Sequence, residues 1–332
     1  MNVLVTGGAG FLGGYVMAAL AAAGHEAFAY DIAPPGPEMR SVAPALATRL
    51  RQGAIMESER LLEVCRVERI EAIVHTAARV GLEPSLADPV AFYQTNVMGL
   101  VNVCEAVRKL GMRKLISISS NAAYHKGKGD KLVETDPPFS VREPNPAGHY
   151  GTSKMAGEAV GMAYAGFQDV DFLALRITAI YGFGMRSPMY IKPMVENAVL
   201  GKPTRFASGG PMKRDYTHVL DCCDAIMMAL GTARWPIGEQ RILNVAAGRA
   251  CTAAEVAGIV RRVIPGADIE IGNTLTPLEE ENVKMRAPLD IAAAKRILGW
   301  SPRWPLEEGV REYADRFRVY VKSQETAKGR ST

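Results

Sequence analysis

The stretch that decides the fold is T-G-G-A-G-F-L-G at residues 6–13. It follows the apolar run NVLVT at residues 2–6 and precedes a segment that favours a helix over residues 11–23. Its glycines are spaced as G-x-x-G-x-x-G, at Gly7, Gly10 and Gly13. A side chain in this turn would keep a pyrophosphate away from the backbone, and the helix that follows offers it free N–H groups. The turn predicts a nucleotide-binding loop, with a glycine turn made only for packing as the alternative.

The residue that selects the dinucleotide is Asp31, at the end of the next apolar run. A carboxylate there accepts hydrogen bonds from both hydroxyls of an adenosine ribose and repels a 2′-phosphate. We therefore expect NAD rather than NADP. The loop does not identify a reaction by itself, because methyltransferases share it.

Short apolar runs alternate with longer amphipathic stretches through the first half of the chain. The expected strands are 2–6, 26–32, 48–55, 71–78, 114–120 and 171–177, and the expected helices are 11–23, 58–69, 88–110 and 150–165. Runs without polar alternation indicate strands covered on both faces, and the alternation with helices indicates a parallel sheet. The sequence predicts an α/β fold, a Rossmann-type doubly wound parallel sheet.

In the second half of the chain the alternation of apolar runs and amphipathic stretches is less regular, and glycine and proline interrupt it. Its expected helices are 189–200, 221–230, 253–264, 290–298 and 306–320. We expect a cofactor-binding core with the catalytic residues over 1–178 and a smaller C-terminal α/β lobe that binds substrate over 179–322. Some segments of that lobe should return to the core, and residues 323–332 should form a flexible tail.

Composition excludes several classes of function. The 332 residues carry 39 basic and 35 acidic side chains without a basic stripe, so neither nucleic acid nor a membrane surface is expected as a partner. The uncharged residues 1–25 are interrupted by glycines and lack a basic start, which argues against a signal peptide or a membrane span. Five cysteines without a C-x-x-C pair predict no disulfide framework and a cytoplasmic location, and the five histidines show no metal-ligand spacing.

The reaction is indicated by Tyr150 and Lys154, four residues apart in a segment that favours a helix. A phenol is a poor base at neutral pH, but a neighbouring ammonium and a nicotinamide cation would both favour the phenolate. Tyr150 could then take a proton from a substrate hydroxyl as hydride leaves the same carbon. Tyr124 and Lys128 have the same spacing, but the glycines around them argue against a helix, and we interpret that pair as coincidence.

Together these motifs resemble the extended short-chain dehydrogenase/reductase superfamily, in the branch of NAD-dependent sugar epimerases and dehydratases. The resemblance also rests on HTAA at 75–78, NVMGLVNV at 96–103, SISSNAAY at 117–124, LRITAIYG at 175–182 and RDYTHVLD at 214–221. It implies an NAD enzyme of sugar metabolism and a homodimer formed through the helices near 88–110 and 150–165.

The resemblance also implies roles for single residues. Ser120, Tyr150 and Lys154 would be catalytic. The cofactor would be bound by Gly7, Gly10, Phe11, Leu12, Gly13, Asp31, Ile32, Ile55, Thr76, Ala77, Ala78, Asn96, Tyr150 and Lys154. The substrate would be contacted by Arg79, Ser120, Asn121, Arg214 and Arg286. No metal is expected.

Departures from the family pattern reduce the number of reactions that we expect of this chain. Family dehydratases and decarboxylases place a carboxylate just after the catalytic hydroxyl, where this chain has Asn121 and Ala122. Epimerisation through a transient ketone is therefore our main hypothesis. Ala179, where nucleotide-sugar enzymes commonly have Asn, favours the alternative, a dehydrogenase of a free sugar, sugar acid or polyol that releases NADH. A non-catalytic NAD sensor is a remote third reading, because sensors typically lose the Tyr/Lys pair.

Overall fold

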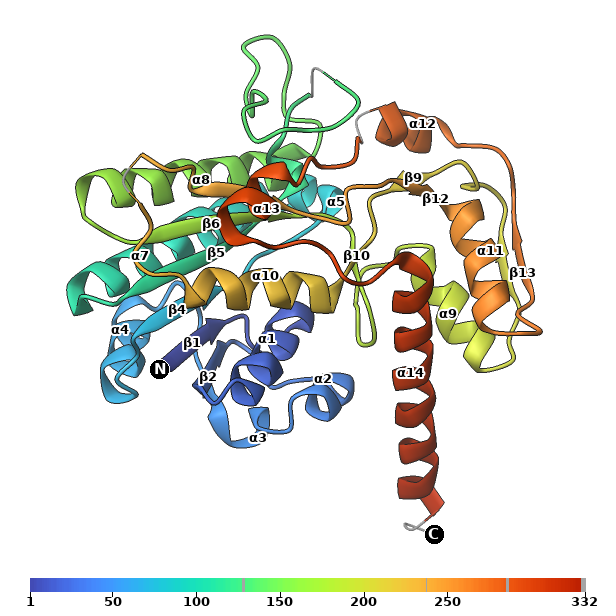
Figure 1. The fold of residues 1–332 in the computed structure, drawn as a ribbon, viewed down its shortest axis with the longest axis horizontal. Coiled ribbons are helices and arrows are strands. Elements are labelled where there is room, and N and C mark those ends of the chain that lie inside the picture. The colour runs from blue at the N-terminus through green and yellow to red at the C-terminus, as the bar shows by residue number, and fades with distance from the viewer. Residues whose placement is uncertain (127–128, 237, 285–286, 330–332) are drawn as a thin grey trace. The chain divides into compact units, whose positions relative to one another are not determined.

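The apolar runs of the amino-terminal half form the parallel sheet that they predict. In the computed structural model, which describes residues 1–126, 129–236, 238–284 and 287–329, the sheet has the strand order β11-β6-β5-β4-β1-β2-β3, and all neighbours run parallel (Figure 1). Its strands are β1 (Asn2–Thr6), β2 (Glu26–Asp31), β3 (Leu50–Gln52), β4 (Ala72–His75), β5 (Lys114–Ser120), β6 (Phe172–Ile177) and β11 (Ile242–Val245). The predicted Rossmann-type fold is confirmed.

Helices flank this sheet. The helices α4 (Ser58–Val67), α7 (Gly99–Leu110) and α8 (Gly148–Phe167) pack with side chains of β1, β2, β4, β5 and β6 into one apolar cluster. The helix α1 (Phe11–Ala22) packs against β1 and β2 and buries Val16 and Leu20. In Figure 1, α7 and α8 run side by side along the sheet.

The stretch expected as one helix over residues 88–110 is divided into three pieces. They are α6 (Pro89–Tyr93), a π-helical turn η1 (Gln94–Met98) and α7. The π turn contains Asn96, whose buried side chain bonds to two other segments. Such turns frequently mark functional sites, and hydrophobic periodicity does not reveal them. The shorter pieces of this half are α2 (Pro37–Val42), α3 (Leu46–Arg49), α5 (Leu82–Ala87) and the 3₁₀ turn η2 (Asn121–Ala123).

The chain divides into two units by its contacts. The first comprises Met1–Thr178 together with Cys222–Val245 and Leu289–Ser301, so that β11 and α13 (Ala292–Leu298) return to the sheet of the amino-terminal half. The helix α10 (Val219–Gly231) begins in the second unit and continues in the first. The assignment of cofactor binding and substrate binding to different lobes stays a prediction.

The second unit is built on helices. The helices α9 (Ile191–Val199), α11 (Ala253–Val263) and α14 (Leu306–Gly329) pack on one another, and α12 (Pro277–Lys284) follows the last strand. Short strands form three pairs, β7 (Ile180–Tyr181) with β10 (Thr217–His218), β9 (Lys213–Arg214) with β12 (Cys251–Thr252), and β8 (Thr204–Phe206) with β13 (Ile269–Ile271).

The last helix runs past its expected end. The sequence predicts a helix over 306–320 and a tail over 323–332, whereas α14 continues to Gly329. Residues 321–328 contain neither Gly nor Pro and include the helix-favouring Lys322, Gln324, Glu325 and Ala327, so nothing local ends the helix. Among the described residues, we find no helix with the length and apolarity needed to cross a membrane.

Candidate functional site

The glycine loop lies where the strand order of the sheet reverses, between β1 and β4. Ligands of open α/β sheets bind at this point. Gly7 has φ +70°, and a Cβ on it would lie 2.7 Å from the backbone nitrogen of Ala77. A Cβ on Gly13 would lie 2.2 Å from the carbonyl oxygen of Gly7. Larger residues are therefore excluded at both positions.

The amino end of α1, which follows this loop, has no side-chain cap. Gly10 is the N-cap residue, and the first turn of the helix has no acidic residue. The first N–H groups of a helix attract anions such as phosphate. The loop therefore fits the pyrophosphate of a dinucleotide. Phe11 and Leu12 follow within the first turn of the helix.

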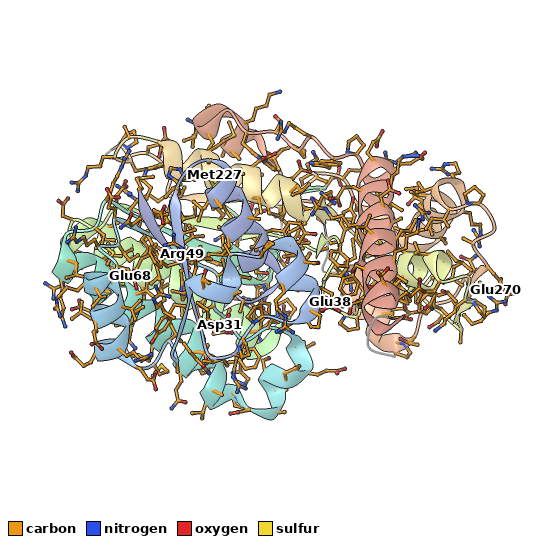
Figure 2. All side chains as sticks on the ribbon, turned by 90° about the horizontal axis from the view of Figure 1, so that it is seen from below. Asp31, Glu38, Arg49, Glu68, Met227 and Glu270 are labelled. Atoms are coloured by element: carbon orange, nitrogen blue, oxygen red, sulfur yellow. The ribbon has the colours of Figure 1, made fainter. Side chains whose placement is uncertain are left out.

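Asp31, which is labelled in Figure 2, ends β2. Its carboxylate is hydrogen-bonded to the glycine loop. One carboxylate oxygen accepts a hydrogen bond from the backbone N–H of Ala9 (3.0 Å), and the other accepts one from Ala33 (3.3 Å). Each carboxylate oxygen has two lone pairs, so both retain capacity for a ribose hydroxyl. Of the apolar residues predicted beside it, Ile32 is 68% exposed, whereas Ile55 is buried in the core cluster.

The segment after β4 is held by Asn96. Its Oδ1 accepts from the backbone N–H of Arg79 (2.8 Å), and its Nδ2 donates to the carbonyl of Arg79 (2.9 Å) and to the hydroxyl of Ser153 (2.9 Å). Asn96 thus connects the segment that contains Ala77 and Ala78 to α8. The hydroxyl of Thr76 donates to the carbonyl of Thr6 (2.7 Å). These bonds fix the backbone of the predicted cofactor wall.

Tyr150 and Lys154 lie in the first two turns of α8, as predicted. The ammonium of Lys154 donates to the carbonyl of Ile118 (2.8 Å), which ties it to β5. Burial lowers the pKa of Lys154 to about 8, and the negative charge of Glu158 opposes this shift. Burial raises the pKa of the Tyr150 phenol above its usual value, while a hydrogen bond with Ser120 lowers it in part.

Ser120 is both a helix cap and a neighbour of the phenol. Its hydroxyl accepts from the backbone N–H of Ala122 (3.1 Å) at the start of η2 and donates to Oδ1 of Asn121 (3.3 Å). The capping bond orients the hydroxyl, and Ser120 lies close enough to the phenol of Tyr150 to lower its pKa. The structure brings Ser120, Tyr150 and Lys154 together.

The predicted substrate arginines have different surroundings. Arg79 is half exposed and forms an ion pair with Asp88 (3.7 Å). Arg214 lies in the second unit on β9, where burial lowers its pKa and the charges of Tyr216, Tyr190 and Glu279 oppose that shift. Arg286 lies outside the described residues.

The second Tyr/Lys pair has a structural role in the part that is described. Tyr124 follows the 3₁₀ turn η2, is buried, and donates its hydroxyl to Oδ1 of Asn244 (2.8 Å). The guanidinium of Arg176 lies 4.3 Å above its ring. Burial raises the pKa of Tyr124 to about 12, which makes it a poor base. Lys128 lies outside the described residues.

Sequence reasoning missed a buried polar cluster beside Lys154. Glu158 accepts from Ser119 and from Arg176. The signal was present, because Glu158 lies four positions after Lys154 just as Lys154 lies four after Tyr150. Arg176 was also visible as a charge within an otherwise apolar strand.

The family model of the NAD dependent epimerase/dehydratase family matches residues 3–246. The chain belongs to this family. The predicted family, enzyme class and NAD cofactor are confirmed, whereas the roles of the glycine loop and Asp31 in binding NAD stay predictions. A UDP-glucose 4-epimerase of Mycolicibacterium smegmatis is 28% identical over 327 residues, which cover 96% of this chain and 99% of that protein.

Solved structures of relatives share the fold over nearly the whole chain. A UDP-glucose 4-epimerase of Thermotoga maritima, solved with UDP-glucose, is 25% identical with a TM-score of 0.82, covering 97% of this chain and 100% of that one. A UDP-glucose 4-epimerase of Thermus thermophilus, in complex with NAD, is 27% identical with a TM-score of 0.79, covering 96% and 99%. This NAD-dependent epimerase/dehydratase therefore has nucleotide-sugar epimerases among its full-length relatives.

Proposed function

We propose that this family member is a nucleotide-sugar 4-epimerase in which Tyr150 is the acid/base. The observation that carries the proposal is the meeting of Ser120, Tyr150 and Lys154 where the end of β5 faces the start of α8, in a chain similar along nearly its whole length to UDP-glucose 4-epimerases. Asn121 and Ala122 follow Ser120, so the carboxylate that an elimination would use is absent from those two positions.

The residues that would hold NAD are those of the loop after β1 and of the strand ends beside it. Gly7, Gly10 and Gly13 let the pyrophosphate reach the amino end of α1, and Asp31 would accept both hydroxyls of the adenosine ribose. Lys154 would donate to the nicotinamide ribose. NAD, when bound, supplies an acceptor that takes hydride from the sugar carbon and returns it.

The proton steps belong to Tyr150. A phenol is protonated at neutral pH even at its usual pKa of about 10, and burial raises the pKa of Tyr150 further. The ammonium of Lys154 and the hydroxyl of Ser120 both favour the phenolate. In that form Tyr150 takes the proton of the sugar hydroxyl. Once the same carbon has also given up its hydride, a ketone results, and Ser120 would orient its oxygen by a hydrogen bond. Tyr150 returns the proton after the sugar has presented its other face.

The test is to add NAD and a panel of UDP-glucose, UDP-galactose, UDP-glucuronate, free sugars and sugar acids to the protein. Products are separated by chromatography while the absorbance of reduced nicotinamide is followed. We expect interconversion of the two 4-epimers of a nucleotide sugar without net NADH. Absence of epimer formation with every nucleotide sugar would refute the proposal.

A dehydrogenase of a sugar without a nucleotide is the second candidate, and one observation favours it. Glu279 places a negative charge close enough to Arg214, a predicted substrate contact, to affect it electrostatically. A carboxylate there would oppose a diphosphate. In the same panel, steady accumulation of NADH with a free sugar or sugar acid would identify this activity.

We also propose that the enzyme is a cytoplasmic homodimer. The helices α6 and α8 expose apolar side chains at Val90, Met162 and Phe167, and the five cysteines are free thiols in buried positions. Light scattering after gel filtration should give the mass of two chains, and charged substitutions at Val90 and Met162 together should give the mass of one.

A further inference from the structure

We propose that Glu158 is a positioning residue of the active site, whose carboxylate, held by Arg176 and Ser119, keeps the ammonium of Lys154 charged and directed at the cofactor ribose. This inference rests on the proposed roles of Tyr150 and Lys154. It adds to them a residue that touches neither substrate nor cofactor.

The first observation is the geometry around Glu158. The carboxylate is 5% exposed and accepts two hydrogen bonds from Arg176, from Nε to Oε1 (2.8 Å) and from Nη2 to Oε2 (2.7 Å). The hydroxyl of Ser119 donates to Oε1 (2.6 Å). Ser119 and Arg176 face each other in the register of β5 and β6, so two neighbouring strands hold one carboxylate of α8.

The second observation is a cavity that Lys154 and Glu158 share. It has a volume of about 10 Å³ and is also lined by Ser117, Ser119 and Asn96. A cavity of this size has room for about one water molecule. The two side chains therefore line one small space, and electrostatic interactions at buried sites are stronger than in bulk water.

The third observation is the set of charges around Lys154. Tyr150 and Glu158 belong to its own helix, His75 faces it from β4, and Arg176 lies behind Glu158 on β6. Burial and the charge of Lys154 lower the pKa of His75 to about 3, so His75 is neutral at working pH. Burial lowers the pKa of Lys154 to about 8, and Glu158 opposes that shift. Glu158 is thus the nearby anion that favours the ammonium.

A purely structural explanation is less satisfactory. A buried ion pair is weak as a stabilising device, since apolar residues of the same volume often serve equally well. Here the pair sits one helical turn beyond the catalytic lysine, where loss of either charge would alter the protonation of Lys154. A structural role predicts lower thermal stability when the pair is broken and nothing more.

The test uses the full chain with lysine labelled by ¹³C at Cε, and the Lys154 signal is identified by its loss in Lys154→Met. The titration midpoint of Lys154 is measured by NMR in four proteins. We expect it to fall by about one pH unit in Glu158→Gln and to rise by a smaller amount, about half a pH unit, in Arg176→Gln. The double variant should lie between Glu158→Gln and the wild type, because Glu158 acts on Lys154 directly and Arg176 acts from behind it.

The matched control is Asp171→Asn, which breaks another buried ion pair next to the same strand β6. It should lower the melting temperature and leave the Lys154 midpoint unchanged. Midpoints that stay fixed, or that move in the same direction in both single variants, would overturn the proposal. If a single variant does not fold, the electrically neutral double variant still tests the proposal. A Lys154 midpoint equal to or above that of the wild type would contradict the proposal that Glu158 affects Lys154 more strongly than Arg176 does.

The consequence for catalysis is a separate measurement. The alkaline limb of the pH profile of turnover should shift with the Lys154 midpoint, and Glu158→Asp, which retains the charge, should restore most of it. If no nucleotide sugar is turned over, the proposed function fails while the NMR titration still decides the role of Glu158.

Discussion

The two ends of the adjacent strands β5 and β6 each bury an ion pair, and the two pairs have different partners. At the amino end, Lys114 contacts Asp171 (3.4 Å) and donates to the carbonyls of Thr232 (3.1 Å) and Ala233 (2.9 Å), just after α10. At the carboxyl end, Arg176 holds Glu158 of the helix that carries Tyr150. Backbone partners at one end indicate a structural brace, whereas the partners at the other end connect to the active site.

This comparison indicates that the role of a buried charged residue follows from the element to which it is hydrogen-bonded. Lys114 is 1% exposed and Arg176 is 2% exposed, so burial does not distinguish them. They differ in the edge of the sheet at which they lie: Lys114 begins β5 at the amino edge, and Arg176 lies near the end of β6 at the carboxyl edge. The carboxyl edge of a parallel sheet binds ligands, and the amino edge carries stability.

The largest effect on stability is expected at the amino end. Lys114→Met should lower the free energy of unfolding by about 3 kcal/mol, because it leaves carbonyls after α10 without a donor and Asp171 with less compensation. Denaturant unfolding measures this loss. Turnover per folded molecule should be unchanged, and a large fall in kcat of the folded protein would contradict the structural role.

The largest effect on chemistry is expected at the carboxyl end. Tyr150→Phe removes the group that moves the proton, so turnover should fall by a factor of about 100 or more while NAD affinity barely changes. Steady-state kinetics and NAD titration check the two halves of this prediction. Unchanged turnover would rule out the phenol as the acid/base.

An effect confined to acidic pH is expected from His75, which ends β4 at the same edge. Its pKa is about 3 in the folded protein and about 6.5 when unfolded, so the unfolded chain binds the proton first. His75 therefore costs stability as pH falls from about 6.5 towards 3, by up to about 1.4 kcal/mol per pH unit. Unfolding of wild type and His75→Gln at several pH values should show a flatter pH dependence in the variant. Parallel curves would contradict a buried neutral histidine.

The smallest effect is expected from Asp31, because other groups also bind the cofactor. Asp31→Ala should weaken NAD by about tenfold or more, through the loss of hydrogen bonds to a charged group. It should also reduce discrimination against NADP, since the carboxylate no longer repels a 2′-phosphate. Binding of both cofactors to both proteins checks this. A wild-type preference for NADP would show that the assignment of Asp31 is wrong.

The same edge explains what could be predicted from the sequence. The strand, glycine turn and helix over Asn2–Ala22 are local, and their residue types are dictated by φ at Gly7 and by close packing at Gly13. The pairing of β11 with β6 is a long-range contact. The four residues of β11 are only moderately hydrophobic, so their sequence does not predict that they join the sheet.

The parts of the site that were missed depend on tertiary contacts. The π turn at Asn96 forms because its side chain bonds to Arg79 and Ser153, and neither partner is near it in sequence. Glu158 has helical spacing from Lys154, but only the neighbouring strands show that it is buried with Arg176.

The most direct test of the central claim is the fate of the hydrogen on the reacting carbon. UDP-glucose carrying deuterium at C4 is incubated with the enzyme and NAD in ordinary water, and the 4-epimer is analysed by mass spectrometry and NMR. Because the hydrogen leaves as hydride and returns to the same carbon, the account predicts that the epimer retains its deuterium at C4. An epimer that has lost the deuterium to solvent would contradict the account, since it would mean that C4 itself is deprotonated.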